Sequence, residues 1–172
     1  MIKDSGTRRE FETGAVRDIQ EGKGRCDLLP LDVAVCLMTC DYRIRDMLLN
    51  IEEYKHSGDT DNLKNCLRKF SIWTTHGEEA PTESHASTLL EVSKHFEEGA
   101  KKYGEYNWQK GIPTHCYIDS AVIHFLKFIR GDKDEPHDRA FVWNILCCMW
   151  TCKHKPELND YPRKEEDAND QT

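Results

Sequence analysis

The stretch that decides the fold spans residues 117–144 and reads YIDSAVIHFLKFIRGDKDEPHDRAFVWN. Its apolar residues recur at steps of three and four positions on both sides of a polar turn, RGDKDE, and this spacing is typical of amphipathic helices. Pro136 stands after that turn, in the first-turn position that helices favour for proline. With its flanking residues, the stretch therefore predicts two helices, at 115–129 and 136–151, joined by a short connection.

The rest of the chain follows the same periodicity, with no segment that indicates a strand. Three more helices are predicted on both sides of the polar loop TTHGEEAPTESHAS, at residues 31–55, 62–72 and 88–103. The 172 residues suffice for a single domain, and we expect it to span residues 1–155. The predicted fold class is therefore all-α, a helical bundle.

The two ends of the sequence lack helical periodicity. Residues 1–30 contain four glycines and scattered charges, so we expect an irregular N-terminal arm. Residues 156–172 contain two prolines and little apolar content, a composition typical of a disordered tail.

Charge and composition narrow the functional classes. A net charge of -7 is the wrong sign for a general nucleic-acid binder, so no stable nucleic-acid partner is expected. No apolar run approaches the roughly 18 residues that span a bilayer, and the first residues, MIKDSGTRREFETG, lack a signal-peptide core. We therefore expect a cytoplasmic protein without a membrane partner, whose eight cysteines are thiols.

The helix at 88–103 carries a polar face. Glu91, His95, Glu98 and Lys102 fall together on a helical wheel, so two carboxylates and one imidazole share a side. Bundles place such acids inward to hold hard cations such as Mg²⁺. The alternative is the solvated face of an ordinary amphipathic helix.

Asp119 lies among apolar neighbours on its predicted helix, and His124 lies on a narrow polar strip of the same helix. A carboxylate in apolar surroundings is costly to bury unless it is paired or bound to a metal. Asp119 is therefore a candidate metal ligand, and a structural hydrogen bond or ion pair is the alternative.

The last helix begins with the pattern E-x-x-D, formed by Glu135 and Asp138, while His137 and Asn144 share another face. These two acids are candidate metal ligands, but acids near a helix start also complement the helix dipole.

Two further groups of residues suit a nucleotide. Trp108 and Trp143 offer rings for stacking on a base, although aromatic residues of a bundle are more often core residues. The N-terminal arm places Arg17, Lys23 and Arg25 among glycines, which can bring positive charge and backbone amides to a phosphate. A flexible basic loop is the alternative for the arm.

Three strings together resemble the phage dATP/dGTP diphosphohydrolase family: GAVRDIQEGKGRCDLLP (14–30), HFEEGAKKYGEYNWQKGIP (95–113) and the stretch 117–144. The motifs are KYG-x-x-NW, a helix with DSA, and H-x-x-A-x-x-WN. That family is similar to the MazG-like all-α nucleoside triphosphate pyrophosphohydrolases. Residues 31–73 look like a helical insertion found in some members.

The resemblance implies hydrolysis of dATP or dGTP to the monophosphate and pyrophosphate, with Mg²⁺ or Mn²⁺, on a MazG-like bundle. It further implies a homo-oligomer, either a dimer or a tetramer, that remodels nucleotide pools in the cytoplasm of a phage-infected bacterium. MazG-like enzymes hold Mg²⁺ through E-x-x-E on one helix and E-x-x-D on the next. Here Asp119 with His124 stands near the first pair, and His137 with Ala140 near the second.

The expected site combines these residues. The catalytic candidates are Glu98, Asp119, His124 and His137. The candidate metal ligands are Glu91, Glu98, Asp119, Glu135 and Asp138. The substrate-binding candidates are Lys23, Arg25, Lys101, Lys102, Tyr103, Asn107, Trp108 and Asn144.

Two alternatives remain. The doublet His137-Asp138 is also found in HD-type metallohydrolases, which release nucleoside and triphosphate or remove phosphates stepwise. A phage binding module without enzymatic activity is the other alternative.

Overall fold

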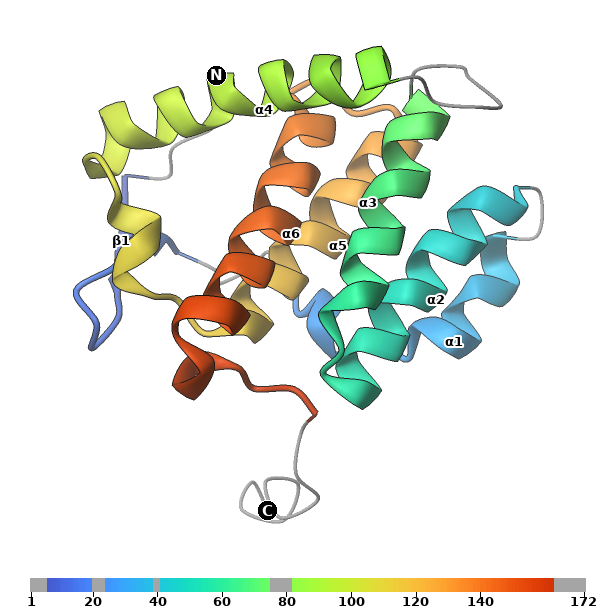
Figure 1. Cartoon of the computed structure of the whole chain (residues 1–172), viewed down its shortest axis with the longest axis horizontal. Coiled ribbons are helices and arrows are strands. Elements are labelled where there is room, and N and C mark those ends of the chain that lie inside the picture. Colours follow the sequence, from blue (N-terminus) through green and yellow to red (C-terminus); the bar gives the residue numbers. More distant parts are fainter. Residues whose placement is uncertain (1–5, 20–23, 39–40, 75–81, 163–172) are drawn as a thin grey trace.

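The computed structural model describes residues 6–19, 24–38, 41–74 and 82–162 (Figure 1). These ranges are predominantly helical, which confirms the all-α fold class. The six α-helices are α1 (Leu31–Ala34), α2 (Tyr42–Ser57), α3 (Thr60–Thr74), α4 (Thr82–Tyr103), α5 (Thr114–Arg130) and α6 (His137–His154).

The prediction of a single helix at 31–55 is wrong, because shorter helices replace it. After α1, a short 3-10 helix (Val35–Met38) follows, and α2 begins only at Tyr42. Asp41 caps α2: its backbone is extended and its carboxylate accepts a hydrogen bond from the backbone N–H of Arg43 at 2.9 Å. A capping residue stops a helix from continuing backwards, although the apolar spacing runs on.

The N-terminal arm is less irregular than predicted. Strands β1 (Arg8–Glu10) and β2 (Val16–Asp18) pair antiparallel, with Arg9 opposite Arg17. A 3-10 helix, Cys26–Leu28, follows along the arm. Strands of three residues are too short to show an alternating pattern in the sequence, so the hairpin could not be inferred.

The helices pack around one hydrophobic core. The most extensive helix–helix contact is between α5 and α6, and α2 and α3 form a second helical hairpin. Phe70 of α3 joins the two pairs, since its ring lies 4.6 Å from that of Phe141 on α6 and 6.1 Å from that of Phe125 on α5. Residues 31–73 therefore contribute to the same core as the rest of the bundle, and α4 lies across α3, α5 and α6 (Figure 1).

The prediction of a disordered tail is wrong for residues 156–162. A 3-10 helix, Pro156–Leu158, leads into Asn159, whose side-chain oxygen accepts hydrogen bonds from the hydroxyls of Tyr54 at 3.0 Å and Thr114 at 3.2 Å. The polar residues that suggested disorder thus satisfy groups of α2 and α5. Residues 163–172 lie outside the described ranges.

Two further expectations concern membrane-spanning helices and the state of the cysteines. No helix in the described ranges is both long and apolar enough to cross a membrane. The described cysteines are free thiols, as expected.

The tail also carries a pH-sensitive contact. The Asp160 carboxylate accepts hydrogen bonds from the His115 backbone N–H at 3.0 Å and from Nδ1 of the His115 ring at 2.6 Å. This partner raises the pKa of His115 to about 9. The pKa of His115 is therefore higher in the folded protein than in the unfolded chain, where it is roughly 6.5. The contact contributes its full stabilisation of the folded state below pH 6.5, and this contribution is lost as the pH rises through 9.

We therefore expect Asp160→Asn to lower the free energy of unfolding by about 1–3 kcal/mol at pH 6 and by clearly less at pH 10. Urea unfolding across this pH range measures the difference. Asp41→Asn is the control, because the partner of Asp41 is Arg43, which stays charged throughout. An equal loss at both pH values for Asp160→Asn would show that the His115 charge contributes nothing.

Candidate functional site

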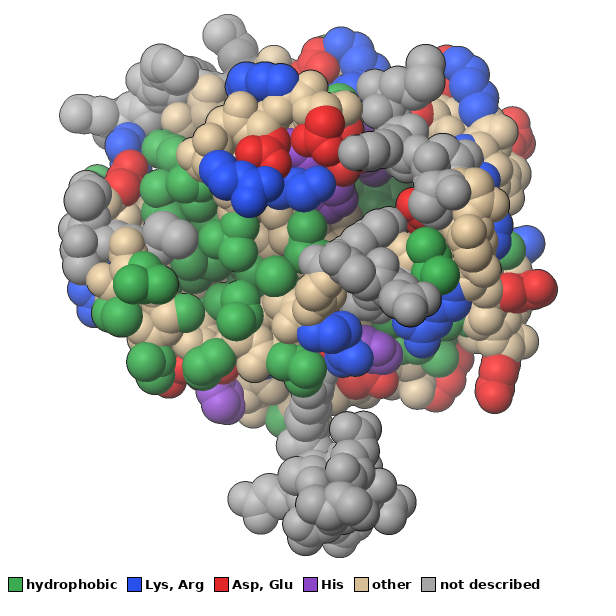
Figure 2. Space-filling view, turned by 180° about the vertical axis from the view of Figure 1, so that it is seen from behind, with side chains coloured by type: hydrophobic (Ala, Val, Ile, Leu, Met, Phe, Trp, Pro, Cys, Tyr) green, Lys and Arg blue, Asp and Glu red, His purple; other side chains and the backbone are tan. Residues whose placement is uncertain are grey.

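A cavity of about 930 Å³ lies between α4, α5, α6 and the N-terminal arm. One stripe of α5 lines it with residues three and four positions apart: Cys116, Asp119, Ser120, Ile123, His124 and Lys127. This spacing places them on one helical face, which extends about 16 Å along the axis. The face shown in Figure 2 has a hollow with histidine side chains inside and both acidic and basic side chains at its rim.

Aromatic side chains form one wall of the cavity. The Phe96 ring of α4 lies 5.4 Å from that of Trp108 and 5.9 Å from that of Trp143 on α6. Two buried polar atoms beside this wall, Nε1 of Trp143 and Nδ1 of His95, lack a hydrogen-bond partner within the described part of the chain. Such atoms are costly to leave unpaired, so a bound molecule with polar groups would offset that cost.

Arg17 of β2 enters the cavity from the arm. Its guanidinium donates hydrogen bonds to the Cys116 carbonyl at 3.0 Å, the Ser120 hydroxyl at 3.1 Å and the Asn144 side-chain oxygen at 2.8 Å. All three acceptors are neutral, and no carboxylate of residues 6–19, 24–38, 41–74 or 82–162 forms an ion pair with Arg17. A fixed guanidinium with an uncompensated charge is suited to bind an anion such as phosphate.

Two asparagines expected to bind the substrate form hydrogen bonds with other parts of the protein. The Asn107 side chain accepts a hydrogen bond from the Val16 N–H at 3.0 Å and donates one to the Val16 carbonyl at 2.8 Å. Asn144 donates to the Ala140 carbonyl and accepts from Arg17. Asn107 thus fixes β2 beside the cavity, and Asn144 fixes the guanidinium that β2 carries.

Asp119 lines the cavity and is almost fully buried, with 1% of its surface exposed. Its Oδ1 accepts hydrogen bonds from the backbone N–H groups of Cys26 and Asp27, so the carboxylate holds the arm against α5. Burial raises its pKa, and these two hydrogen bonds partly offset that rise. Asp119 therefore makes the structural hydrogen bonds of the alternative interpretation, and it also faces the cavity.

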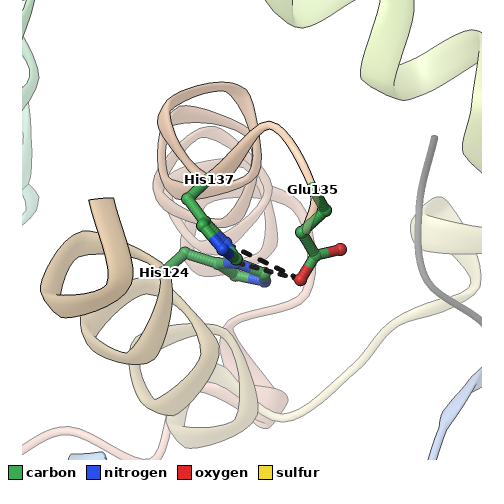
Figure 3. Close-up of side chains that lie close together, drawn as sticks. All are labelled: His124, Glu135 and His137. Carbon is green, nitrogen blue, oxygen red and sulfur yellow. Dashed lines mark hydrogen bonds and ion pairs between the residues drawn. The ribbon is translucent and has the colours of Figure 1, made fainter. Parts of the chain in front are cut away.

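At one end of the cavity, three potential metal ligands converge from α5, from the loop before α6 and from the first turn of α6 (Figure 3). Nδ1 of His124 lies 3.0 Å from Nδ1 of His137, and Oε1 of Glu135 lies 3.6 Å and 3.7 Å from these two nitrogens. Burial, followed by the neighbouring His137, lowers the pKa of His124 to about 3, so its ring is neutral at pH 7.

The donor set of this cluster decides which cation fits. Two imidazole nitrogens and one carboxylate oxygen suit a divalent transition metal, including Mn²⁺, whereas Mg²⁺ prefers oxygen ligands throughout. Of the two expected cations, Mn²⁺ therefore fits the cluster and Mg²⁺ does not.

A family model described as dATP/dGTP diphosphohydrolase, N-terminal, matches residues 76–161, half of the chain. The chain belongs to this family. No curated protein and no solved structure matches it.

The dATP/dGTP diphosphohydrolase match covers α4, α5 and α6, which supply most of the cavity lining, and the family's name implies an enzyme. The arm with Arg17 and the helices α1 to α3 lie outside the matched residues.

The acids expected to form the metal site of this diphosphohydrolase do not come together. Within the described ranges, no group of three potential metal ligands includes Glu91, Glu98, Asp119 or Asp138. Glu91 is exposed and pairs with Lys94, and Glu98 faces Arg139 at 3.6 Å. Asp138 lies half-buried in the first turn of α6. Of the expected metal ligands, only Glu135 belongs to the cluster.

The cationic residues expected to bind the substrate are also dispersed. Lys101 is exposed and pairs with Glu97, and Lys102 lies over the Tyr103 ring. Arg25 forms an ion pair with the buried Asp27 at 2.7 Å. Lys23 lies outside the described residues. None of the three described cations lines the cavity, whereas the other expected residues Tyr103, Trp108 and His124 do.

Sequence reasoning missed three residues of the site. Arg17 was considered only as one of several basic residues of the arm, and nothing in the sequence pairs it with Asn144, 127 positions away. His95 was placed on a polar face, but it is 7% exposed and lines the cavity. Asp134 was considered part of a turn, although it contacts His137. None of these three residues lies on α5, whose polar strip was the available signal for the cavity itself, because a polar residue on a buried helix face indicates a cavity or partner.

Proposed function

We propose that the chain hydrolyses dATP or dGTP to the monophosphate and pyrophosphate in the cavity between α4, α5, α6 and the arm. The observation that carries the proposal is the combination, in one cavity of about 930 Å³, of an aromatic wall, the uncompensated Arg17 and the His124–Glu135–His137 cluster. A volume of this size is typical of small-molecule sites. The family match supports the same activity.

Each part of the cavity suits one part of the substrate. The rings of Phe96, Trp108 and Trp143 offer faces for stacking a purine, worth about 1–3 kcal/mol per base. Arg17 lies at the Ser120–Asn144 level of α5 and α6, where its donors can bind phosphate oxygens. Lys127 lines the cavity one turn beyond His124 and adds a second cation.

The chain's residues position the triphosphate and offset its charge, and a divalent cation at the cluster would supply Lewis acidity and an activated water. Arg17 is held in place before substrate arrives, because Asn144 and the Cys116 carbonyl fix its orientation. Preorganised donors of this kind stabilise charge that grows in the transition state.

The test is incubation with each of the common deoxynucleoside and ribonucleoside triphosphates plus Mn²⁺ or Mg²⁺, followed by ion-pair chromatography of the products. We expect dAMP or dGMP with pyrophosphate, and turnover supported better by Mn²⁺. Nucleoside with inorganic triphosphate would instead support the HD-type alternative. His137 of the HD doublet does join the cluster, but Asp138 does not. Absence of metal-stimulated turnover would favour a binding module.

The assembly and setting of this activity are also part of the proposal. We propose a homo-oligomer that acts on nucleotide pools in the cytoplasm of a phage-infected bacterium. The adjacent leucines Leu89 and Leu90 of α4 are 56% and 68% exposed, which supports a contact between copies. Light scattering coupled to size-exclusion chromatography measures the state, and a monomer at all concentrations would contradict this part.

A further inference from the structure

We propose that His124, Glu135 and His137 bind one divalent transition-metal cation, and that Asp134 orients His137 for this purpose. The three donor atoms come from two helices and the loop between them, so their convergence is a result of the tertiary fold (Figure 3). The use of this cation in nucleotide cleavage rests on the proposed function, whereas binding of the cation does not.

The distances within the cluster match those between ligands of a single ion. Metal–ligand distances of about 2.1 Å place neighbouring donors about 3.0 Å apart at right angles and about 3.4 Å apart at tetrahedral angles. The three donor pairs of the cluster are separated by 3.0, 3.6 and 3.7 Å. A cation can therefore enter with small side-chain rotations.

Asp134 sets the tautomer of His137. Nε2 of His137 lies 2.9 Å from Oδ1 of Asp134, and a carboxylate only accepts hydrogen bonds, so Nε2 carries a proton. Nδ1 is then the nitrogen of His137 that is left to bind a cation, and it faces His124 and Glu135. A carboxylate behind a ligating histidine is a common way to fix its orientation and raise its basicity.

Burial favours the same assignment. The His137 side chain is fully buried and the Glu135 side chain is 10% exposed, so a cation here is held away from bulk water. His124 and Glu135 nevertheless line the cavity, which gives the cation access to a ligand bound there. Imidazole-containing sites favour Co²⁺, Ni²⁺ and Zn²⁺ over Mn²⁺, and they disfavour Mg²⁺.

A second set of potential ligands shares His137 but uses its other nitrogen. Asp132, Asp134 and His137 lie close together on the outer side of the ring. Both acids already have cationic partners, since Asp132 pairs with Arg130, and Asp134 lies 3.6 Å from Lys127. The inner set is therefore favoured, and the experiment must separate the two.

The test measures metal binding to the full chain without nucleotide. Co²⁺ is titrated while its visible absorption is recorded, and isothermal titration gives the affinities for Mn²⁺ and Co²⁺. We expect one Co²⁺ per chain, tighter binding of Co²⁺ than of Mn²⁺, and no displacement of Co²⁺ by Mg²⁺ in roughly tenfold excess.

The variants Glu135→Gln and His124→Asn are expected to abolish the Co²⁺ spectrum, and Asp134→Asn to weaken affinity by about 10–100-fold. Asp132→Asn and His56→Asn are the controls and should bind as the unmodified chain does, because Asp132 belongs only to the outer set and His56 lies on α2 with 70% of its side chain exposed. Circular dichroism and thermal unfolding confirm that each variant is folded.

Several results would overturn the proposal. These are binding lost in Asp132→Asn but kept in Glu135→Gln, binding of Mg²⁺ as tight as that of Co²⁺, or no Co²⁺ spectrum in the unmodified chain. Each is independent of catalysis, so a chain that binds Co²⁺ without cleaving dATP or dGTP would contradict the proposed function and leave the metal site standing.

Discussion

Replacement of Arg17 by methionine is expected to lower kcat/KM for the preferred triphosphate by about 10²–10³-fold, the range seen when a preorganised charge-stabilising donor is removed. The guanidinium has three neutral acceptors and lies among the residues that line the cavity. The Cζ atom of Arg17 lies 5.2 Å from the centre of the Tyr117 ring, so the side chain also packs on α5. Methionine retains much of that packing and removes the charge.

Steady-state kinetics with dATP and dGTP measure this effect. Arg25→Met on the same arm is the comparison, because Arg25 pairs with Asp27 and does not line the cavity. Its kcat/KM should be much closer to that of the unmodified chain. Arg17→Lys should give an intermediate loss, since lysine retains the charge but not the planar fork. Equal losses for Arg17→Met and Arg25→Met would show that Arg17 acts only by holding the arm.

Replacement of Glu135 by glutamine is expected to lower kcat by about 10²-fold or more, as loss of a ligand to a catalytic cation does. The change preserves shape and removes the negative charge, and the Glu135 side chain, in the loop before α6, is 10% exposed. Turnover is measured with Mn²⁺ at saturating nucleotide, so that altered substrate affinity does not contribute.

Two further variants serve as the control and the comparison for this experiment. Glu53→Gln, on the exposed side of α2, should leave kcat unchanged. Glu98→Gln should lower kcat less than Glu135→Gln does, because Glu98 faces Arg139 outside the cluster. A larger loss for Glu98→Gln would favour the acidic ligand set inferred from the MazG-like pattern.

The helices that the sequence predicts best are those with unbroken periodicity. The two helices expected at 115–129 and 136–151 correspond to α5 (Thr114–Arg130) and α6 (His137–His154). The spacing of apolar residues indicates which positions are buried, and this spacing continues through Asp41. The helix nevertheless begins after Asp41, because the side chain of this residue caps it. It also says nothing of the hairpin β1–β2 or of Asn159, whose contacts are polar and distant in sequence.

For the site, the sequence provided residue types but not their partners. His124, Glu135 and His137 were all expected to act, yet their grouping depends on the way α5 and α6 face each other. The acids Glu91 and Glu98 share the helical face that the wheel predicts, but they pair with Lys94 and Arg139. Of that face, His95 lines the cavity. Periodicity gives the face of each helix and leaves open which faces meet.

The attachment of the arm has a consequence for the order in which the protein matures. Arg17 is translated early, but its acceptors on α5 and α6 follow 99 to 127 residues later. At a synthesis rate of about 5–20 residues per second, Cys116, Ser120 and Asn144 are added roughly 5–25 s after Arg17. Contacts this far apart also form late during folding, because a long loop must close first. In a nascent chain, the guanidinium of Arg17 is therefore fixed only after α5 and α6 have been made.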